Sequence, residues 1–133
     1  MIDVMSLVGI VFSGLSALVI EDVEDDGGAV IVRARTPGRT VACPGCGTAT
    51  GRVYGHHERT AADVPVDGRR VVVKLRARRM RCPVLGCAVQ TFREQVPDVV
   101  GRYQRRTVRL AGQVEATARG LAGRAGSRLL GHR

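Results

Sequence analysis

Hydrophobic and basic residues alternate along residues 69–81, the most regular pattern in the chain. A period of two predicts a β-strand over Arg69–Arg81, and the Asp67-Gly68 pair before it predicts a tight turn. One face of this strand is apolar and consists of Val71, Val73, Leu75 and Ala77. The other face, shared with Val72, consists of Arg70, Lys74, Arg76 and Arg78. We expect the first face in the core and four positive charges exposed on the second.

An uncharged stretch of 17 residues runs from Val4 to Ile20. This length reaches only the lower limit for a membrane span, and no basic residue precedes the stretch, as a signal peptide requires. We predict that it forms core, with a membrane or export segment as the alternative.

A β-hairpin is predicted next. Leu18–Ile20 is the first short strand, Asp25–Gly28 the loop, and Ala29–Arg35 the returning strand. Thr36-Pro37-Gly38 ends that strand, and the polar stretch 48–68 predicts strand pieces and loops.

The pattern becomes helical after Pro97. Apolar residues recur at spacings of three and four, and then three glycines interrupt the run at Gly120, Gly123 and Gly126. We predict a first helix over about 103–119 and a second over about 124–131, joined by a glycine-containing turn. This is how a helix-turn-helix begins.

Charge is distributed unevenly along the 133 residues. Residues 1–32 carry six of the 12 acidic residues and no Lys or Arg, whereas residues 33–133 carry all 21 basic residues. A strongly basic segment suggests a polyanionic partner, most simply nucleic acid. The alternative is a coding bias, because 20 of the 21 basic residues are Arg. With two Phe, two Tyr and no Trp, the core is small, and a small core often needs a metal or a disulfide.

The four cysteines form two close pairs, Cys43-Pro44-Gly45-Cys46 and Cys82–Cys87, separated by 35 residues. Two short turns of this kind can direct four thiolates to one point, which is the layout of a four-cysteine zinc ribbon. The predicted ligands of structural Zn²⁺ are therefore Cys43, Cys46, Cys82 and Cys87. The alternatives are disulfides or a redox centre at the first pair, which would leave the second pair without a role.

The histidines and the scattered carboxylates indicate a functional site less strongly than the cysteines do. His56 and His57 are adjacent in a polar stretch and are predicted as surface residues, with metal ligation or contact to a nucleic-acid backbone as alternatives.

No catalytic residues are predicted. The carboxylates outside the acidic N-terminal segment are few and scattered, and Asp63 and Asp67 precede residues typical of turns.

Basic residues gather at two places that could contact phosphates. The first is the polar face of residues 69–81, for which a solvated strand face is the alternative. The second lies at the start of the predicted helix, where positive charge opposes the helix dipole and a bound anion would help explain it. The candidate DNA-binding residues are Arg70, Lys74, Arg76, Arg78, Arg105, Arg106 and Arg109.

Several motifs together resemble one known family. They are Val41–Gly47, Arg59, Asp63-Val64-Pro65, Arg79-Met80-Arg81-Cys82, and Cys87 followed by Thr91–Glu94. In this order and spacing they are similar to the N-terminal zinc-finger region of insertion-sequence transposases of the ISL-three type. Tyr103, Arg105–Thr107 and Gly123–Gly126 resemble the start of that family's helix-turn-helix, so the likeness covers about residues 10–133.

The resemblance implies a bacterial, cytoplasmic, nucleoid-associated zinc module that binds the terminal inverted repeats of a mobile element. We expect an α+β fold with a hairpin segment over 1–36, a β-rich zinc ribbon over 37–98 and a helical segment over 99–133. The family's catalytic domain is expected to be missing, and the helix-turn-helix incomplete. A smaller departure is Val66, where an aromatic residue often follows this motif.

The leading hypothesis is a zinc-binding, DNA-binding transposase module without catalysis of its own and without a membrane partner. One rival is a protein-interaction zinc ribbon, for example one that pairs with a full-length transposase. The others are a redox protein using the first cysteine pair and a nonfunctional transposase relic.

Overall fold

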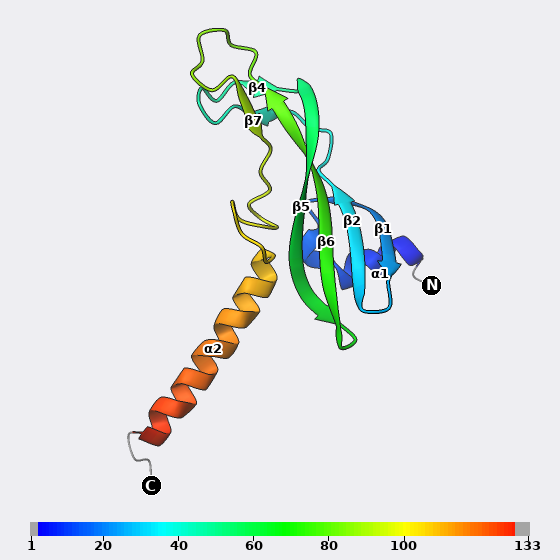
Figure 1. Ribbon diagram of the computed structural model, residues 1–133, viewed down its shortest axis with the longest axis vertical. Coiled ribbons are helices and arrows are strands. Elements are labelled where there is room, and N and C mark those ends of the chain that lie inside the picture. The colour runs from blue at the N-terminus through cyan, green and yellow to red at the C-terminus, as the bar shows by residue number, and fades with distance from the viewer. Residues whose placement is uncertain (1–2, 130–133) are drawn as a thin grey trace.

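The computed structural model describes residues 3–129, with side chains described as far as residue 123. Figure 1 shows an elongated molecule with a twisted sheet in the middle, short strands and loops at one end, and a helix projecting from the other. The elements are α1 (Val4–Val11), η1 (Ser13–Leu15), β1 (Val19–Asp25), β2 (Ala29–Arg35), β3 (Val41–Ala42), β4 (Ala49–Thr50), β5 (Val53–Val66), β6 (Arg69–Arg81), β7 (Thr91–Arg93) and α2 (Val108–Leu129). The predicted α+β class is confirmed.

The main sheet has the strand order β1-β2-β6-β5, and β7 adds to the end of β6. The β1–β2 hairpin is antiparallel, as predicted, whereas β2 and β6 run parallel to each other. The sheet therefore joins the N-terminal hairpin to the strand that leads into the second cysteine pair. The predicted division of the chain after residues 36 and 98 stays a prediction.

The strand predicted over Arg69–Arg81 is confirmed with both of its ends. It forms a long antiparallel hairpin with β5, closed by Asp67 and Gly68, which have φ angles of 52° and 72°. Two successive residues with positive φ are what a tight type I′ turn requires, and an Asp-Gly pair tolerates them. The stretch predicted as strand pieces and loops is mostly this one continuous strand, β5.

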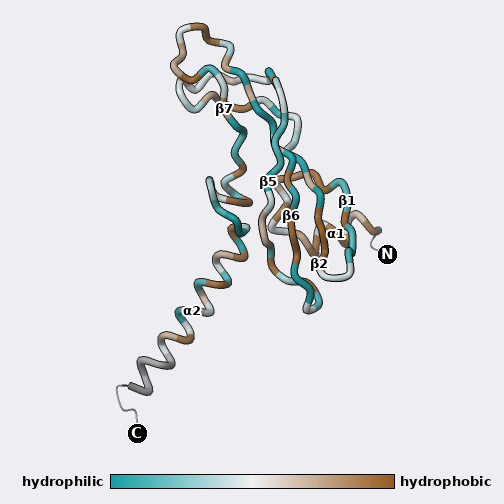
Figure 2. The backbone as a smooth tube through the Cα atoms, viewed as in Figure 1, coloured by the Kyte–Doolittle hydropathy of each residue, from teal (hydrophilic) through white to brown (hydrophobic). Residues whose placement is uncertain are grey.

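The core covers one face of the sheet. Its β6 residues are those predicted from the alternation, and Figure 2 shows hydrophobic positions concentrated in β2 and β6. Phe12, Leu15 and Leu18 cover this face from the N-terminal side, and Val99 and Val100 cover it from the connection before α2. All five of these side chains are buried.

The first part of the uncharged stretch, α1, is mostly exposed, although Val8 packs against the core. None of the residues of α1 is buried, and Val4, Met5 and Ile10 are more than half exposed. The prediction of a core segment over Val4–Ile20 is therefore wrong for most of α1 and is confirmed for Phe12, Leu15 and Leu18. Within residues 3–129, no helix has both the length and the apolar character needed to cross a bilayer.

One helix replaces the two that the glycines suggested. The helix α2 runs without a break from Val108 to Leu129 through Gly120 and Gly123. Glycine in a helix costs only about 1 kcal/mol relative to alanine, so these glycines do not end the helix. The prediction of two helices is wrong. Residues 103–107 are not helical, and the last residues of the predicted second helix, 130 and 131, lie outside the described part.

Asp63 fixes the start of α2 to the sheet. The hydroxyl of Thr107 donates to Asp63 Oδ1 (2.7 Å), and Arg109 Nη2 donates to Asp63 Oδ2 (2.8 Å). The prediction of Asp63 as a turn residue is wrong, because it lies buried in β5. Its carboxylate also supplies the anion that a basic helix start calls for.

A second buried ion pair ties β6 to the residues after β7. Arg78 Nη2 donates to Glu94 Oε2 (2.7 Å), and the Thr36 hydroxyl donates to Glu94 Oε1 (2.6 Å). Burial acts to raise the pKa of Glu94, but these hydrogen bonds outweigh it and hold the pKa below its ordinary value. The prediction that Arg78 faces solvent is therefore wrong, since this side chain is used inside the fold.

We expect Arg78→Met and Glu94→Leu each to lower the free energy of unfolding by about 3–5 kcal/mol, because each leaves a buried charge without its partner. The double variant should cost much less than the sum, and urea denaturation at pH 7 with saturating zinc measures this. The exposed pair of Arg119 with Glu115 is the matched control. Its double-mutant cycle should give less than about 0.5 kcal/mol. Additive costs at Arg78 and Glu94 would contradict the buried pair.

Candidate metal centre and basic surfaces

The first cysteine pair occupies a tight turn between β3 and β4, which form a small antiparallel sheet of their own. The N–H of Cys43 donates to Thr48 O (2.9 Å), and the N–H of Gly47 donates to Cys43 O (2.8 Å). Gly47 has a φ of 75°, which glycine adopts without strain. The N–H of Gly45 points at Cys43 Sγ, 3.4 Å away.

The second pair lies between β6 and β7 and repeats this arrangement. The N–H of Cys82 donates to Gln90 O (2.9 Å), which closes the turn. The N–H of Val84 points at Cys82 Sγ, again at 3.4 Å. In both turns the first cysteine thus accepts from the amide two residues on, a contact that stabilises a thiolate.

The two turns bring all four sulfurs together. Cys43 Sγ lies 3.7 Å from Cys87 Sγ, and Cys46 Sγ lies 3.6 Å from Cys82 Sγ. All four sulfurs are within 4.8 Å of one another, and all four thiols are free. A tetrahedron with Zn–S bonds of about 2.3 Å has sulfur–sulfur edges of about 3.8 Å. The cluster therefore fits a zinc ion.

The electrostatics of the cluster also call for a cation. Hydrogen bonds from Thr48 lower the pKa of Cys46 to about 6. The Val84 N–H acts to lower the pKa of Cys82, but burial and the neighbouring thiols raise it to about 12. The Cys46 thiol thus ionises readily, and its negative charge opposes ionisation of the Cys82 thiol. A divalent metal removes this resistance, because its charge offsets that of the thiolates.

Close packing between the two turns depends on Gly45. A Cβ at this position would lie 2.8 Å from Val89 Cγ2 and 3.2 Å from Cys87 Sγ. The first of these contacts is too short for a side chain to occupy without movement. Gly45 therefore lets one turn lie directly against the other.

The metal's role is structural. Four protein ligands fill a tetrahedral shell and leave no position for a substrate. The strands β3 and β4 have two residues each, far too short to be stable unaided. Zn²⁺ held by Cys43, Cys46, Cys82 and Cys87 would fix these turns to the ends of β6 and β7.

The geometry of the cluster bears on a redox centre at the first cysteine pair and on metal ligation by the histidines. All four cysteines share one cluster, so the second pair has a role that a redox centre at the first pair would not give it. Among the described residues the only cluster of metal-binding side chains is this one, and neither His56 nor His57 belongs to it.

The seven basic residues predicted to contact DNA divide into two groups. Arg78 and Arg109 are engaged with Glu94 and Asp63. The remaining five form no ion pair among the described residues and are exposed or half-buried; they are Arg70, Lys74, Arg76, Arg105 and Arg106. The first three share the outer face of β6, and the last two precede α2 at the edge of β5.

Sequence reasoning missed a basic groove on the opposite side of β5 and β6. Its lining includes Arg79, Arg93 and Arg102, with Tyr54 and Tyr103. Arg79 falls on the face of β6 that alternation predicts as core, and it is not among the residues predicted to contact DNA. The available signal was Tyr103, which directly follows Arg102, because an aromatic residue next to a cation often marks a binding surface.

Comparison with known proteins finds one family model that is similar to part of this chain, residues 39–87. This segment matches the family model described as the zinc-finger of transposase IS204/IS1001/IS1096/IS1165. The match contains all four cysteines, so the predicted resemblance is confirmed for this part of the chain and the cluster is a structural zinc site. No curated protein and no solved structure matches the chain.

We expect Cys82→Ser to abolish stoichiometric zinc binding and to lower the thermal midpoint strongly, because three thiolates bind zinc more weakly and the short strands lose their anchor. Native mass spectrometry under reducing conditions measures zinc content, and circular dichroism measures the midpoint. Leu85→Ser is the matched control, since Leu85 lies in the same turn and is 96% exposed. Retention of one zinc and of the full midpoint by Cys82→Ser would contradict the site.

Proposed function

We propose that this chain is a zinc-stabilised DNA-binding module that recognises the terminal inverted repeats of a mobile element. The observation that carries the proposal is the match of residues 39–87 to a transposase zinc finger, in a chain with a formal net charge of +9. A zinc-fixed fold with excess positive charge suits a phosphate-rich partner. Such a partner would place the protein in the bacterial cytoplasm at the nucleoid.

The outer face of the sheet supports binding to a DNA backbone. In the register between β2 and β6, Lys74 lies opposite Arg33 and Arg76 lies opposite Arg35. Arg33 is paired with Asp22 and Glu24 of β1, so its charge is compensated. Lys74 and Arg76 have no such partner among the described residues.

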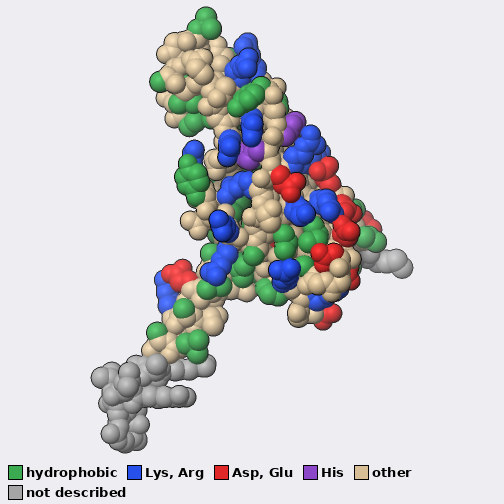
Figure 3. Space-filling model, in the orientation of Figure 1, with side chains coloured by type: hydrophobic (Ala, Val, Ile, Leu, Met, Phe, Trp, Pro, Cys, Tyr) green, Lys and Arg blue, Asp and Glu red, His purple; other side chains and the backbone are tan. Residues whose placement is uncertain are grey.

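The acidic β1 strand limits where a polyanion can bind. Figure 3 shows acidic side chains gathered over the β1 side of the molecule, with basic ones among them, whereas mainly basic side chains follow the other side from the zinc end toward α2. A DNA backbone is therefore expected along β6 and β5, away from β1. Arg105 and Arg106 extend this path, because residue 106 bridges to Ala62 of β5.

We expect no catalysis by this chain alone. Asp63 and Glu94, the buried carboxylates among the described residues, are each held by an arginine and by a threonine hydroxyl. Carboxylates held in this way are poorly placed to bind the metal ions of a nuclease or strand-transfer site.

A protein-interaction role is the second candidate, and the surface of α2 favours it. One face of this helix carries apolar residues at spacings of three and four, and Val114 and Leu121 are 40% and 60% exposed. The face consists of Leu110, Val114, Ala118 and Leu121, with Gln113 and Thr117 beside it. A full-length transposase that offers a matching helix is the partner this role implies.

The test is a titration of the zinc-loaded chain with a fluorescent 20-base-pair DNA duplex across a range of salt concentrations. A variant with Arg70, Lys74 and Arg76 changed to Gln should bind more weakly on every sequence. Its salt slope should flatten by up to about three units, since each lost phosphate contact removes about one.

Matched controls separate this effect from a loss of net charge. A variant with Arg33, Arg35 and Arg119 changed to Gln loses the same charge at residues that already lie beside carboxylates. It should keep most of the slope. Zinc bound without measurable duplex affinity at low salt would reject the DNA-binding proposal and favour the protein-interaction role.

A further inference from the structure

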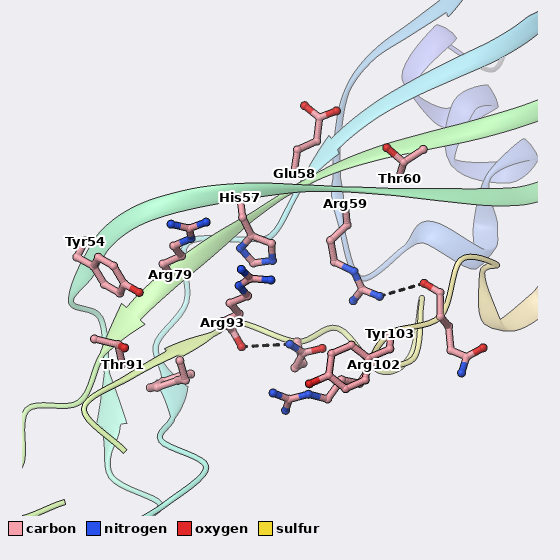
Figure 4. A pocket seen from close by; sticks show the side chains of 13 residues that line it. Tyr54, His57, Glu58, Arg59, Thr60, Arg79, Thr91, Arg93, Arg102 and Tyr103 are labelled. Atoms are coloured by element: carbon pink, nitrogen blue, oxygen red, sulfur yellow. Dashed lines mark hydrogen bonds between the residues drawn. The ribbon is translucent and has the colours of Figure 1, made fainter. Parts of the chain in front are cut away.

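A groove of about 770 Å³ lies on the side of β5 and β6 opposite the outer basic face. Its walls come from β5, the end of β6, β7 and the connection toward α2, so residues far apart in sequence line it. Figure 4 shows His57, Arg59 and Arg93 directed into it, with Arg102 and Tyr103 across the opening. Its volume suits a ligand of nucleotide size.

The groove concentrates positive charge without compensation. Arg79, Arg93 and Arg102 line it, and none of them has a carboxylate partner among the described residues. The one carboxylate in the lining, Glu58, points to the other side of β5 in Figure 4. Arg59 is already used, because it donates to the carbonyl oxygens of Gly101 (2.8 Å) and Gln104 (3.2 Å) and so holds the wall in place.

Two of these arginines face each other across neighbouring strands. Arg79 of β6 is paired in register with Arg93 of β7. Like charges directly opposite in an antiparallel pair destabilise a sheet. An anion bound between the two guanidinium groups would turn this repulsion into attraction.

Two buried polar atoms in the groove lack partners. Within the part of the chain whose side chains are described, only His57 Nδ1 and Arg79 Nε are buried side-chain nitrogens or oxygens without a hydrogen bond. Both residues line the groove. Because an unsatisfied buried polar atom is costly and rare, its recurrence at one place indicates a bound group that accepts hydrogen bonds.

Aromatic side chains flank the charges. The chain has two tyrosines, Tyr54 and Tyr103, and both line the groove. They are 46% and 86% exposed. Arg81 lies over the Tyr54 ring at 5.6 Å from its centroid, and Arg102 lies over the Tyr103 ring at 5.4 Å.

The backbone at Tyr103 is also unusual. Its φ is 62°, a left-handed conformation that a bulky residue rarely adopts. Such strain persists mainly where the position of a side chain has a use. Here it holds an aromatic ring at the edge of a basic groove.

We propose that this groove binds a single strand of DNA, with a phosphate held by Arg79, Arg93 and His57 and a base stacked on Tyr103. A positive groove with exposed aromatic rings is how proteins hold unpaired strands, whereas a duplex keeps its bases inside. The proposal rests on the proposed function and adds to it a second surface with a different form of DNA. An acidic peptide would use the arginines but would not need the rings.

The electrostatics of His57 agree with an anion site. Burial lowers the pKa of His57, and Arg93, Arg79 and Arg59 lower it further. The ring therefore sits in a positive field, which favours an incoming phosphate.

The experiment uses the zinc-loaded chain and two fluorescent probes, a single-stranded oligothymidylate of 12 nucleotides and a duplex of 12 base pairs. Arg79→Gln with Arg93→Gln should weaken single-strand binding about tenfold or more and flatten its salt slope by about 1.4 units. Arg39→Gln with Arg119→Gln removes the same charge outside the groove and should change neither quantity appreciably.

Tyr103→Gly separates binding from folding. Glycine relieves the positive φ, so this variant should be at least as stable as the parent protein. Loss of the ring should nevertheless weaken single-strand binding about tenfold, and Tyr103→Phe should restore it. Equal affinity of Tyr103→Gly and the parent would overturn the stacking role.

Adjacent histidines report which surface is occupied. His57 faces the groove, whereas His56 pairs with Arg78 in register and lies on the outer face. In NMR spectra, oligothymidylate should shift the ring signals of His57 more than those of His56. A larger shift of His56, or no loss of affinity in the Arg79 and Arg93 variant, would overturn the groove proposal.

The duplex probe distinguishes the two proposals. Duplex binding that depends on Arg70, Lys74 and Arg76, with no single-strand binding, would reject the groove and leave the proposed function standing. Single-strand binding at His57 without duplex binding would support the groove and reject recognition of duplex repeats. Displacement of the oligothymidylate by polyglutamate at equal charge, with Tyr103→Gly binding as tightly as the parent, would indicate an acidic partner and reject the groove proposal.

Discussion

Four thiol sulfurs lie within 4.8 Å of one another, and the arrangement of the chain at this end of the sheet depends on the zinc ion that they can hold. The strands β3 and β4 have two residues each and are too short to hold the turns that carry the sulfurs. Zinc would join the turn between β3 and β4 to the turn between β6 and β7, and so fix the direction in which the chain returns along the sheet. The returning chain forms one wall of the basic groove, so a structural metal shapes a surface that it does not touch.

Two buried carboxylates fix the chain that continues from the metal site toward α2. Glu94 secures the chain just after β7, and Asp63 secures the start of α2. Between these two anchors lies the connection that carries Tyr103 and covers the core with Val99 and Val100. The same contacts bury Arg78 and engage Arg109, which stays partly exposed, with a carboxylate. In a protein with 21 basic residues, the placement of a few acids therefore decides which arginines face a partner.

The sheet offers two basic surfaces because a β-strand alternates its sides. Lys74 and Arg76 face one side of β6 and Arg79 faces the other, and on β5 the neighbours His56 and His57 divide in the same way. The outer face is open and suits the backbone of a duplex. The groove is walled and contains both tyrosines, which suits an unpaired strand. Because the two surfaces lie on opposite sides of one hairpin, they can be tested separately.

The sequence by itself determined the metal ligands, the strand over Arg69–Arg81, the hairpin turns and the resemblance that residues 39–87 confirm. These features are local, since spacing and period act within a few residues. The continuity of α2 and the exposure of α1 depended on tertiary structure, because only packing decides whether glycines break a helix or an apolar helix is buried. The ion-pair partners of Arg78 and Arg109 also depended on tertiary structure, since Glu94 lies 16 residues from Arg78 and Asp63 lies 46 residues from Arg109. Local patterns do not encode such distant pairings, so the fold alone decided which charges are free.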